Sequence, residues 1–126
     1  MDVEAIAVEG VAAPTGQFNH AVRGGVIVAI SGQVGLDHTG RLAGPEVGRQ
    51  ARQAFENLRA VLASAGLDFG DVLRLTIYVS ASALVGAVAE VRRDYLVEPW
   101  PASTVVVAQL LSPEWLVEID ALAVAR

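Results

Sequence analysis

The segment LVEIDALAV, residues 116–124, constrains the fold more than any other part of the chain. Positions 117, 119, 121 and 123 are all apolar, and Glu118 and Asp120 stand between them. A period of two is that of a β-strand, in which alternate side chains lie on opposite faces of the sheet. The segment therefore predicts a strand with one face in a hydrophobic core and two carboxylates on the other face.

The remaining apolar residues divide the chain into further strands and two helices. Alternation or short apolar runs predict strands at 18–22, 26–30, 71–80 and about 102–111, with a further strand within 3–8 left open. Spacings of three and four predict helices over 45–65 and 83–96. The predicted order is β-β-α-β-α-β-β within one domain, residues 1–126.

This order predicts an α+β fold, because two helices are too few to cover both faces of a five- or six-stranded sheet. The uncovered face should be polar if it met water, yet Val105, Val106 and Val107 make their strand apolar on both sides. The chain is also 53% apolar, with a positive mean hydropathy of +0.47. We therefore expect copies of the chain to bury this face against one another in a cyclic homo-oligomer.

Composition argues against several classes of function. The net charge of −5, without any basic run, argues against nucleic acid or anionic membranes as partners. The chain has neither cysteine nor lysine, which removes disulfides, thiolate catalysis, Schiff-base lysines and P-loops. Its two histidines fit no metal-binding motif, so no metal site is predicted. The acidic N-terminus and the lack of an apolar run of about 20 residues predict a cytoplasmic protein without a membrane span.

Two groups of residues near the predicted strands are candidates for chemistry. Glu118 and Asp120 are expected to face the oligomer, where either both pair with arginines such as Arg23 or Arg74 across an interface, or one of them activates water as a general base. Phe18 and His20 should share a strand face. We interpret His20 as an interface hydrogen-bonding residue, a second base or a polar clamp.

The stretch EPWPASTVVV, residues 98–107, carries the other candidates. Its two prolines flank Trp100 and push the chain into an extended approach to the valine strand. Ser103 and Thr104 are the last polar side chains before that strand. No GxSxG motif surrounds Ser103, so these hydroxyls are expected to orient a ligand or a water molecule.

Four motifs together resemble one known family. SGQVGLD, RQARQAFENLRAVLASAGLDFGDVLRLTIYVS, PAST and WLVEIDALAV resemble the RidA (YjgF) family, over about residues 15–124. The resemblance implies a chorismate-mutase-like α+β fold, a homotrimer with its sheets inside, and small-molecule clefts between subunits. It also implies enamine or imine deaminase activity without a cofactor.

The resemblance assigns roles to individual positions. Glu118 corresponds to the glutamate that helps activate water, and Gly32 to the glycine of the SGQ motif. Four other positions differ from the family pattern: Ser103 replaces the arginine that holds the substrate carboxylate, Phe18 replaces a tyrosine, Val105 a cysteine and Ala89 an asparagine. A hydroxyl cannot replace the charge and bidentate geometry of a guanidinium.

These assignments lead to two hypotheses of different class. In the first, the protein hydrolyses a small neutral imine or enamine without a carboxylate, and activity on 2-aminoacrylate is weak or absent. Glu118 would be the base, Ser103 and Thr104 would orient the ligand, His20 would assist, and Trp100 would wall the cleft. In the second, the protein is a non-catalytic trimer that binds a ligand or serves as an interaction platform.

Overall fold

The computed structural model describes residues 2–126, so Met1, the first residue of the predicted domain, lies outside the described residues. The elements are β1 (Val3–Ala5), β2 (Ala21–Gly24), β3 (Ile27–Val34), α1 (Val47–Ser64), β4 (Val72–Val79), α2 (Val85–Arg92), β5 (Ala102–Val107) and β6 (Val117–Val124). Two short 3-10 helices, η1 (Phe69–Asp71) and η2 (Ser82–Leu84), precede β4 and α2. The predicted order is confirmed, including the N-terminal strand that the sequence left open.

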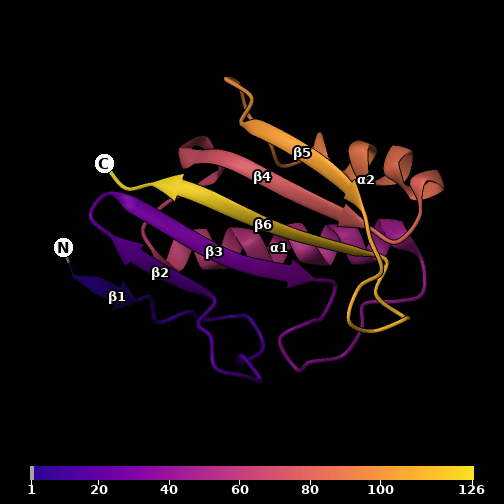
Figure 1. Cartoon of the computed structure of the whole chain (residues 1–126), viewed down its shortest axis with the longest axis horizontal. Helices are drawn as coiled ribbons and strands as arrows, with labels where there is room; N and C mark the ends of the chain where they lie inside the picture. Colours follow the sequence, from indigo (N-terminus) through magenta and orange to yellow (C-terminus); the bar gives the residue numbers. More distant parts are fainter. Residues whose placement is uncertain (1) are drawn as a thin grey trace.

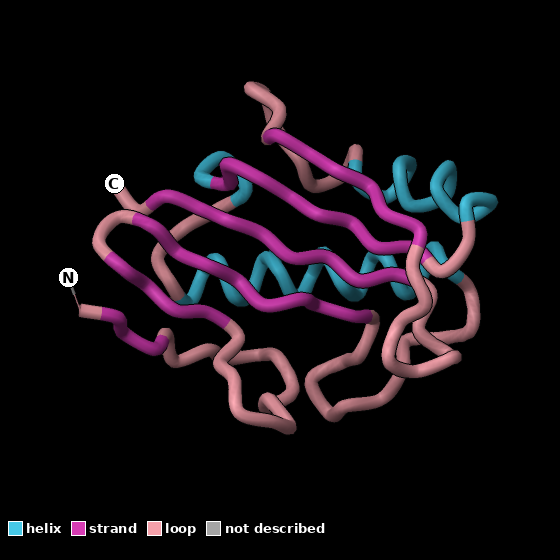
Figure 2. The backbone as a smooth tube through the Cα atoms, viewed as in Figure 1, coloured by secondary structure: helices cyan, strands magenta, loops and turns pink. Residues whose placement is uncertain are grey.

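The six strands form one mixed sheet in the order β1-β2-β3-β6-β4-β5. Neighbouring strands are antiparallel except β4 and β5, which are parallel and joined through α2. Figure 1 shows β6 in the middle of the sheet, with β5 at one edge and β1 at the other. In Figure 2 the long helix α1 crosses behind the central strands, and α2 packs against α1. The predicted α+β architecture, with two helices on one face, is confirmed.

The hydrophobic core lies between the sheet and the helices. The odd-numbered positions of β6 from 117 to 123 are at most 4% exposed, as their alternation predicts. The side of α1 that meets them is spaced by three and four, with Ala51, Ala54, Phe55, Leu58, Val61 and Leu62 fully buried. Burial of one such large apolar side chain stabilises a fold by about 1.5–3 kcal/mol. The core therefore holds the helix face of β6 firmly and leaves Glu118 on the opposite face.

Two buried amides connect α1 to the loops around the sheet. Gln50 Nε2 donates to the carbonyls of Gly44 and Glu114 at 2.9 and 3.0 Å, and its Oε1 accepts from the Leu116 amide at 2.8 Å. Asn57 Nδ2 donates to carbonyls at positions 34 and 36, at 3.0 and 2.8 Å. These bonds satisfy backbone groups that would otherwise be buried without partners. They also fix the end of β3 and the start of β6, from which the site is built.

Several predicted boundaries differ from the observed ones. β2 begins at Ala21, so Phe18 and His20 precede it, and the prediction that they share a strand face is wrong. The second helix ends at Arg92, because the backbone then tightens into a turn in which the Tyr95 amide donates to the Arg92 carbonyl. β5 ends at position 107, since its only neighbour β4 ends at the paired position 79. β3 is longer than predicted and contains an irregularity between positions 30 and 33.

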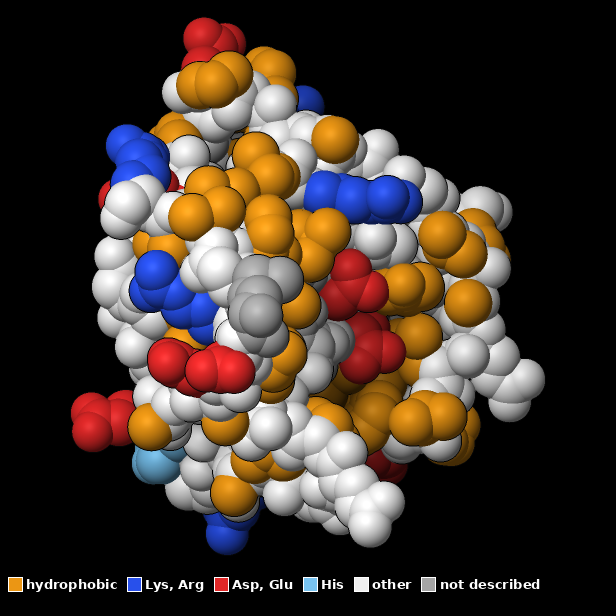
Figure 3. All heavy atoms as spheres, turned by 60° about the vertical axis from the view of Figure 1, so that its left-hand side comes forward, with side chains coloured by type: hydrophobic (Ala, Val, Ile, Leu, Met, Phe, Trp, Pro, Cys, Tyr) orange, Lys and Arg blue, Asp and Glu red, His pale blue; other side chains and the backbone are white. Residues whose placement is uncertain are grey.

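Strand register determines which side chains share the outward face, the face of the sheet away from the helices. One row across this face contains Glu118, Tyr78 and Val106, and the next contains Asp120, Thr76 and Thr104. The prediction that both carboxylates lie opposite the core is therefore confirmed. Apolar groups share this face, with Ile27 and Leu122 about 40% exposed. Figure 3 shows hydrophobic side chains across much of the visible surface, with charged groups scattered among them.

Candidate functional site

Glu118 is partly buried on the outward face of β6. Burial is the main cause that raises the pKa of its carboxyl above the usual value, and the negative charge of Asp120 adds to the effect. Among residues 2–126, no hydrogen bond or ion pair engages the Glu118 carboxylate. The alternative of a pairing with Arg23 or Arg74 concerns an interface between copies and stays a prediction. A partly buried carboxylate with a raised pKa and no partner is typical of a catalytic base.

Gly32 gives the Glu118 carboxylate the room that it occupies. A Cβ added at Gly32 would overlap Glu118 Oε2 and would lie 2.7 Å from Glu118 Cδ. Any side chain at position 32 would therefore displace the carboxylate. The backbone of β3 is in direct contact with the Glu118 side chain here. Close packing, and not the backbone angles of residue 32, therefore requires a glycine at this position.

His20 is held by hydrogen bonds at both ring nitrogens. Its Nε2 lies 2.6 Å from the carbonyl oxygen of Ala12, which can only accept, so Nε2 carries the proton. Its Nδ1 then accepts from Gln33 Nε2 at 3.2 Å. Gln33 is 2% exposed and also donates to the carbonyl of Ser31. With both nitrogens occupied, the geometry favours the interpretation of His20 as a polar clamp that holds the segment before β2 over the site.

A cavity of about 300 Å³ joins Glu118, Gly32, His20 and Phe18. The Phe18 and His20 rings meet edge-on, with centroids 6.3 Å apart. Trp115, in the turn before β6, lines the same cavity and was not among the predicted site residues. The sequence signal for it was a tryptophan in a polar turn, SPEW, two residues before a buried strand. The cavity combines one free carboxylate with aromatic walls, which suits a small organic ligand.

Asp120 has a structural partner, unlike Glu118. Tyr78 Oη donates to Asp120 Oδ2 at 3.0 Å across the β4–β6 pair. This hydrogen bond is the main cause that raises the pKa of Tyr78 above its usual value, with burial second. Asp120 therefore anchors a tyrosine beside Glu118 while adding negative charge to the site.

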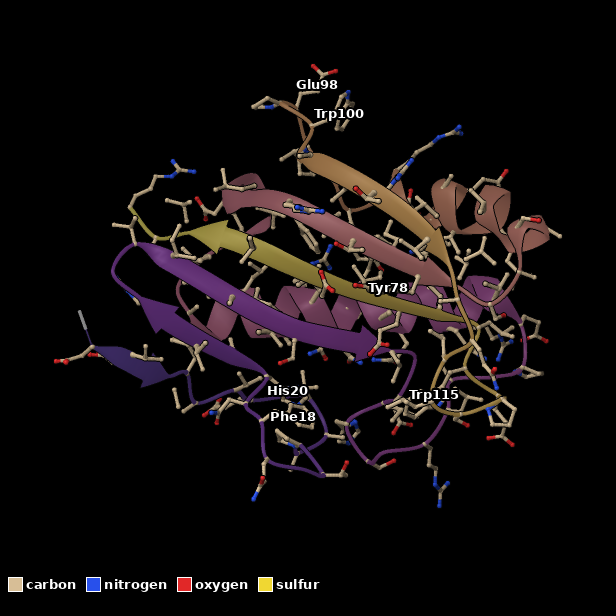
Figure 4. All side chains as sticks on the ribbon, viewed as in Figure 1. Phe18, His20, Tyr78, Glu98, Trp100 and Trp115 are labelled. Carbon is tan, nitrogen blue, oxygen red and sulfur yellow. The ribbon has the colours of Figure 1, made fainter. Side chains whose placement is uncertain are left out.

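Ser103 and Trp100 lie in a different cavity from Glu118. This cavity, of about 360 Å³, lies between the end of α2 and the start of β5 and is lined by Arg92, Arg93, Leu96, Trp100, Pro101 and Ser103. Ser103 pairs with Leu75, which is fully buried on the helix side of the sheet. Ser103 therefore lies on the opposite face from Glu118. Figure 4 shows Trp100 beyond the start of β5, far from Phe18 and His20.

The other predicted site residues also divide between the two faces of the sheet. Ala89 and Val105 line a small cavity of about 30 Å³ between α2 and β5, together with Arg92. Thr104 alternates with Ser103 and lies on the outward face, in the row of Thr76. Within one chain, the site residues thus form an outward group around Glu118 and a group between α2 and β5.

The described residues offer no obvious metal site. Residues 2–126 contain no group of three or more His, Cys, Asp or Glu side chains placed to hold one ion. No helix in the same range is long and apolar enough to cross a bilayer.

Comparison with known proteins matches nearly the whole chain to one family. A family model described as endoribonuclease L-PSP matches residues 10–125. A 2-iminobutanoate/2-iminopropanoate deaminase of Salmonella typhimurium is 33% identical over 124 residues, covering 96% of this chain and 97% of that protein. A RutC family protein of Pyrococcus horikoshii is 32% identical over 121 residues, covering 95% and 96%.

Solved structures have the same fold. RidA from an Antarctic Psychrobacter has a TM-score of 0.90 and 31% identity, covering 96% of this chain and 98% of that one. The YjgF gene product of E. coli has a TM-score of 0.88 and 29% identity, covering 98% and 99%. From the match over residues 10–125 and the shared fold, this chain belongs to the RidA family.

Proposed function

We propose that this protein hydrolyses the C=N bond of a small imine, or of the enamine from which it forms, with Glu118 as the base. The observation that carries the proposal is the Glu118 carboxylate, which is partly buried, unpaired within residues 2–126 and open to a cavity of about 300 Å³. The names of several relatives, 2-iminobutanoate/2-iminopropanoate deaminase, support the same reaction class.

The proposed reaction needs one base that can return its proton. Water attacks the carbon of a neutral imine as Glu118 accepts one of the water protons, and Glu118 gives this proton to the nitrogen, which leaves a carbinolamine. Glu118 then accepts the hydroxyl proton of the carbinolamine and passes it to the nitrogen as the C–N bond breaks, so ammonia leaves a carbonyl product and the ionised base is restored. A carboxyl group with a raised pKa suits both steps, because its protonated form, which returns the proton, persists to a higher pH than that of an ordinary glutamate. No cofactor is needed for this sequence.

A complete site needs more than one copy of the chain. Glu118 and Ser103 lie on opposite faces of the sheet, so a single chain cannot direct both at one small ligand. The apolar outward face supports association of copies, and we propose a homotrimer whose clefts join the Glu118 cavity of one copy to the α2–β5 cavity of another. We further propose a cytoplasmic protein that does not bind nucleic acid, in keeping with its net charge of −5.

The charge of the substrate depends on the residues of the α2–β5 cavity. Ser103 brings no positive charge to the position where the resembling enzymes carry an arginine. Position 103 by itself therefore favours a substrate without a carboxylate. Trp100 would add an apolar wall to the same cavity, and Thr104 would add a hydroxyl on the outward face.

The proposal is tested by ammonia release from freshly generated imines. The purified protein would be given 2-iminobutanoate and, separately, a neutral imine of similar size. Glu118→Gln keeps the shape of the side chain but removes the base, so kcat/KM should fall at least about 100-fold. Unchanged turnover in Glu118→Gln would overturn the proposal.

The non-catalytic alternative makes a different prediction in the same experiment. If the wild-type protein accelerates hydrolysis of neither imine and still binds small molecules in the cleft, a binding role is favoured. The unpaired state of Glu118 argues for the enzyme, because an unused buried carboxylate costs folding free energy.

A further inference from the structure

Two arginines lie beside Ser103 in the α2–β5 cavity. Arg92 and Arg93 line it, and the rest of the lining is apolar apart from the Ser103 hydroxyl. Arg92 is the last residue of α2 and is partly buried, whereas Arg93 is exposed. Arg92 also lines the small cavity with Ala89 and Val105, so its side chain borders the whole space between α2 and β5.

Neither arginine has a carboxylate partner within residues 2–126. The ion pairs formed there use other arginines, at positions 49, 52, 59 and 126. Two acids lie two residues from Arg92 in sequence. Asp94 is bonded by Arg52 at 2.8 Å. Glu90 is exposed and forms no ion pair with Arg92 or Arg93. Glu98 is exposed, does not line the cavity, and extends outward beside Trp100 in Figure 4. The cavity thus has positive charge that no described acid neutralises.

We propose that Arg92 is the anion-binding residue of the substrate cleft and supplies from α2 the positive charge that Ser103 lacks. The proposal rests on the proposed imine hydrolysis and names its substrate class, a small 2-imino acid with a free carboxylate. The prediction of a neutral substrate considered position 103 alone. The cavity instead offers a guanidinium and the Ser103 hydroxyl together.

The chemistry of the cavity suits a carboxylate. A guanidinium binds a carboxylate with two parallel hydrogen bonds, and a hydroxyl can donate a third. A partly buried guanidinium without a partner is costly, and binding an anion relieves that cost. The apolar wall of Leu96, Trp100 and Pro101 would exclude water and strengthen the attraction. In a chain of net charge −5, this cavity is a local exception that attracts small anions.

The test compares Arg92→Gln with the matched control Arg41→Gln, at an exposed arginine before α1 that lines none of these cavities. The probe is 2-oxobutanoate, the carbonyl product of 2-iminobutanoate, and its binding to the full-length protein is measured by calorimetry. Hydrogen bonds to charged groups contribute about 1.5–3 kcal/mol, so Arg92→Gln should weaken binding by about 10- to 150-fold. Arg41→Gln should change it by less than about threefold.

Kinetics and a rescue variant complete the test. Arg92→Gln should lower kcat/KM for 2-iminobutanoate by a similar factor and leave that for a neutral imine unchanged, because only the imino acid has a carboxylate to lose. Adding Ser103→Arg to Arg92→Gln should restore binding of 2-oxobutanoate. Binding in Arg92→Gln within twofold of wild type would overturn the proposal.

The two proposals fail in distinguishable ways. Binding of 2-oxobutanoate that depends on Arg92, without hydrolysis of any imine, would overturn the catalytic function and support the anion site. Hydrolysis that depends on Glu118 but is indifferent to Arg92 would overturn the anion site and support the catalytic function.

Discussion

At the scale of single residues, the environment of the Glu118 carboxylate opposes its ionisation. Burial and the negative charge of Asp120 both raise its pKa. The folded chain therefore keeps this proton to a higher pH than the unfolded chain, and the free energy of unfolding falls as pH rises above the ordinary glutamate pKa. A raised pKa is also the property expected of the proposed base, which must accept and then release a proton.

The pH dependence of turnover tests this account. Only the ionised Glu118 accepts a proton, so kcat/KM should be lost as pH falls through its raised pKa. Asp120→Asn removes a neighbouring negative charge, so it should lower that pKa and move the acidic limb of the kcat/KM profile to lower pH. Tyr78→Phe removes the hydrogen bond but keeps the Asp120 charge, and it serves as the control. An acidic limb that does not move in Asp120→Asn would contradict the assignment.

At the scale of elements, Gln50 connects α1 to two loops near the site, the loop before α1 and the loop before β6. It bonds the chain before α1 and the turn before β6 through three hydrogen bonds, and it is fully buried. Gly35 packs against it so closely that an added Cβ would lie 2.7 Å from Gln50 Cα. The position of Glu118 on β6 therefore depends on a residue of α1.

Replacing this amide should destabilise the protein markedly. Gln50→Ala leaves buried backbone groups without partners and creates a void, which should lower the free energy of unfolding by about 2–4 kcal/mol. Gln53→Ala, which removes one hydrogen bond to Asn57, is the control and should cost less than about 1.5 kcal/mol. Urea denaturation measures both. Equal midpoints for the two variants would show that Gln50 does not have this role.

At the scale of the whole molecule, the outward face is the surface that copies would share. It carries exposed apolar groups in the central strands, including Leu122 on β6 and Ile27 on β3. The helix side of the sheet is occupied by the core, so this face is the remaining broad surface of the sheet. The division of the site between two faces gives association a functional reason.

A charge on this face should disrupt the proposed trimer. Leu122→Glu would place an unpaired carboxylate between copies, so analytical ultracentrifugation should show monomers at concentrations where the wild type is a trimer. Imine hydrolysis should fall with the trimer, because the proposed cleft joins residues of two copies. Val26→Glu, in the exposed β2–β3 turn, should leave both unchanged. A trimeric and active Leu122→Glu would exclude this face as the interface.

Local patterns in the sequence were sufficient to predict that two helices cover one face of a sheet, and to predict the order of the elements. The spacing of α1 and the alternation of β6 are periodic over many residues, so they report which side chains face the core without knowledge of the partner. The prediction that Glu118 lies on the face opposite the core succeeded for this reason. Phe18 and His20 were misplaced because the strand pattern of 18–22 was short, and hydrogen bonds from Ala12 and Gln33 hold His20 outside β2.

The sequence by itself thus determined the α+β class, the buried face of each long element and the side of the sheet on which Glu118 lies. Only the tertiary structure decided which residues share a cavity. Ser103 was separated from Glu118 by the register of β5 on β4 and of β4 on β6, which joins segments distant in the chain. Arg92 came beside Ser103 through the packing of α2 against the same edge. Such pairings depend on long-range contacts, and no periodicity within a single segment encodes them.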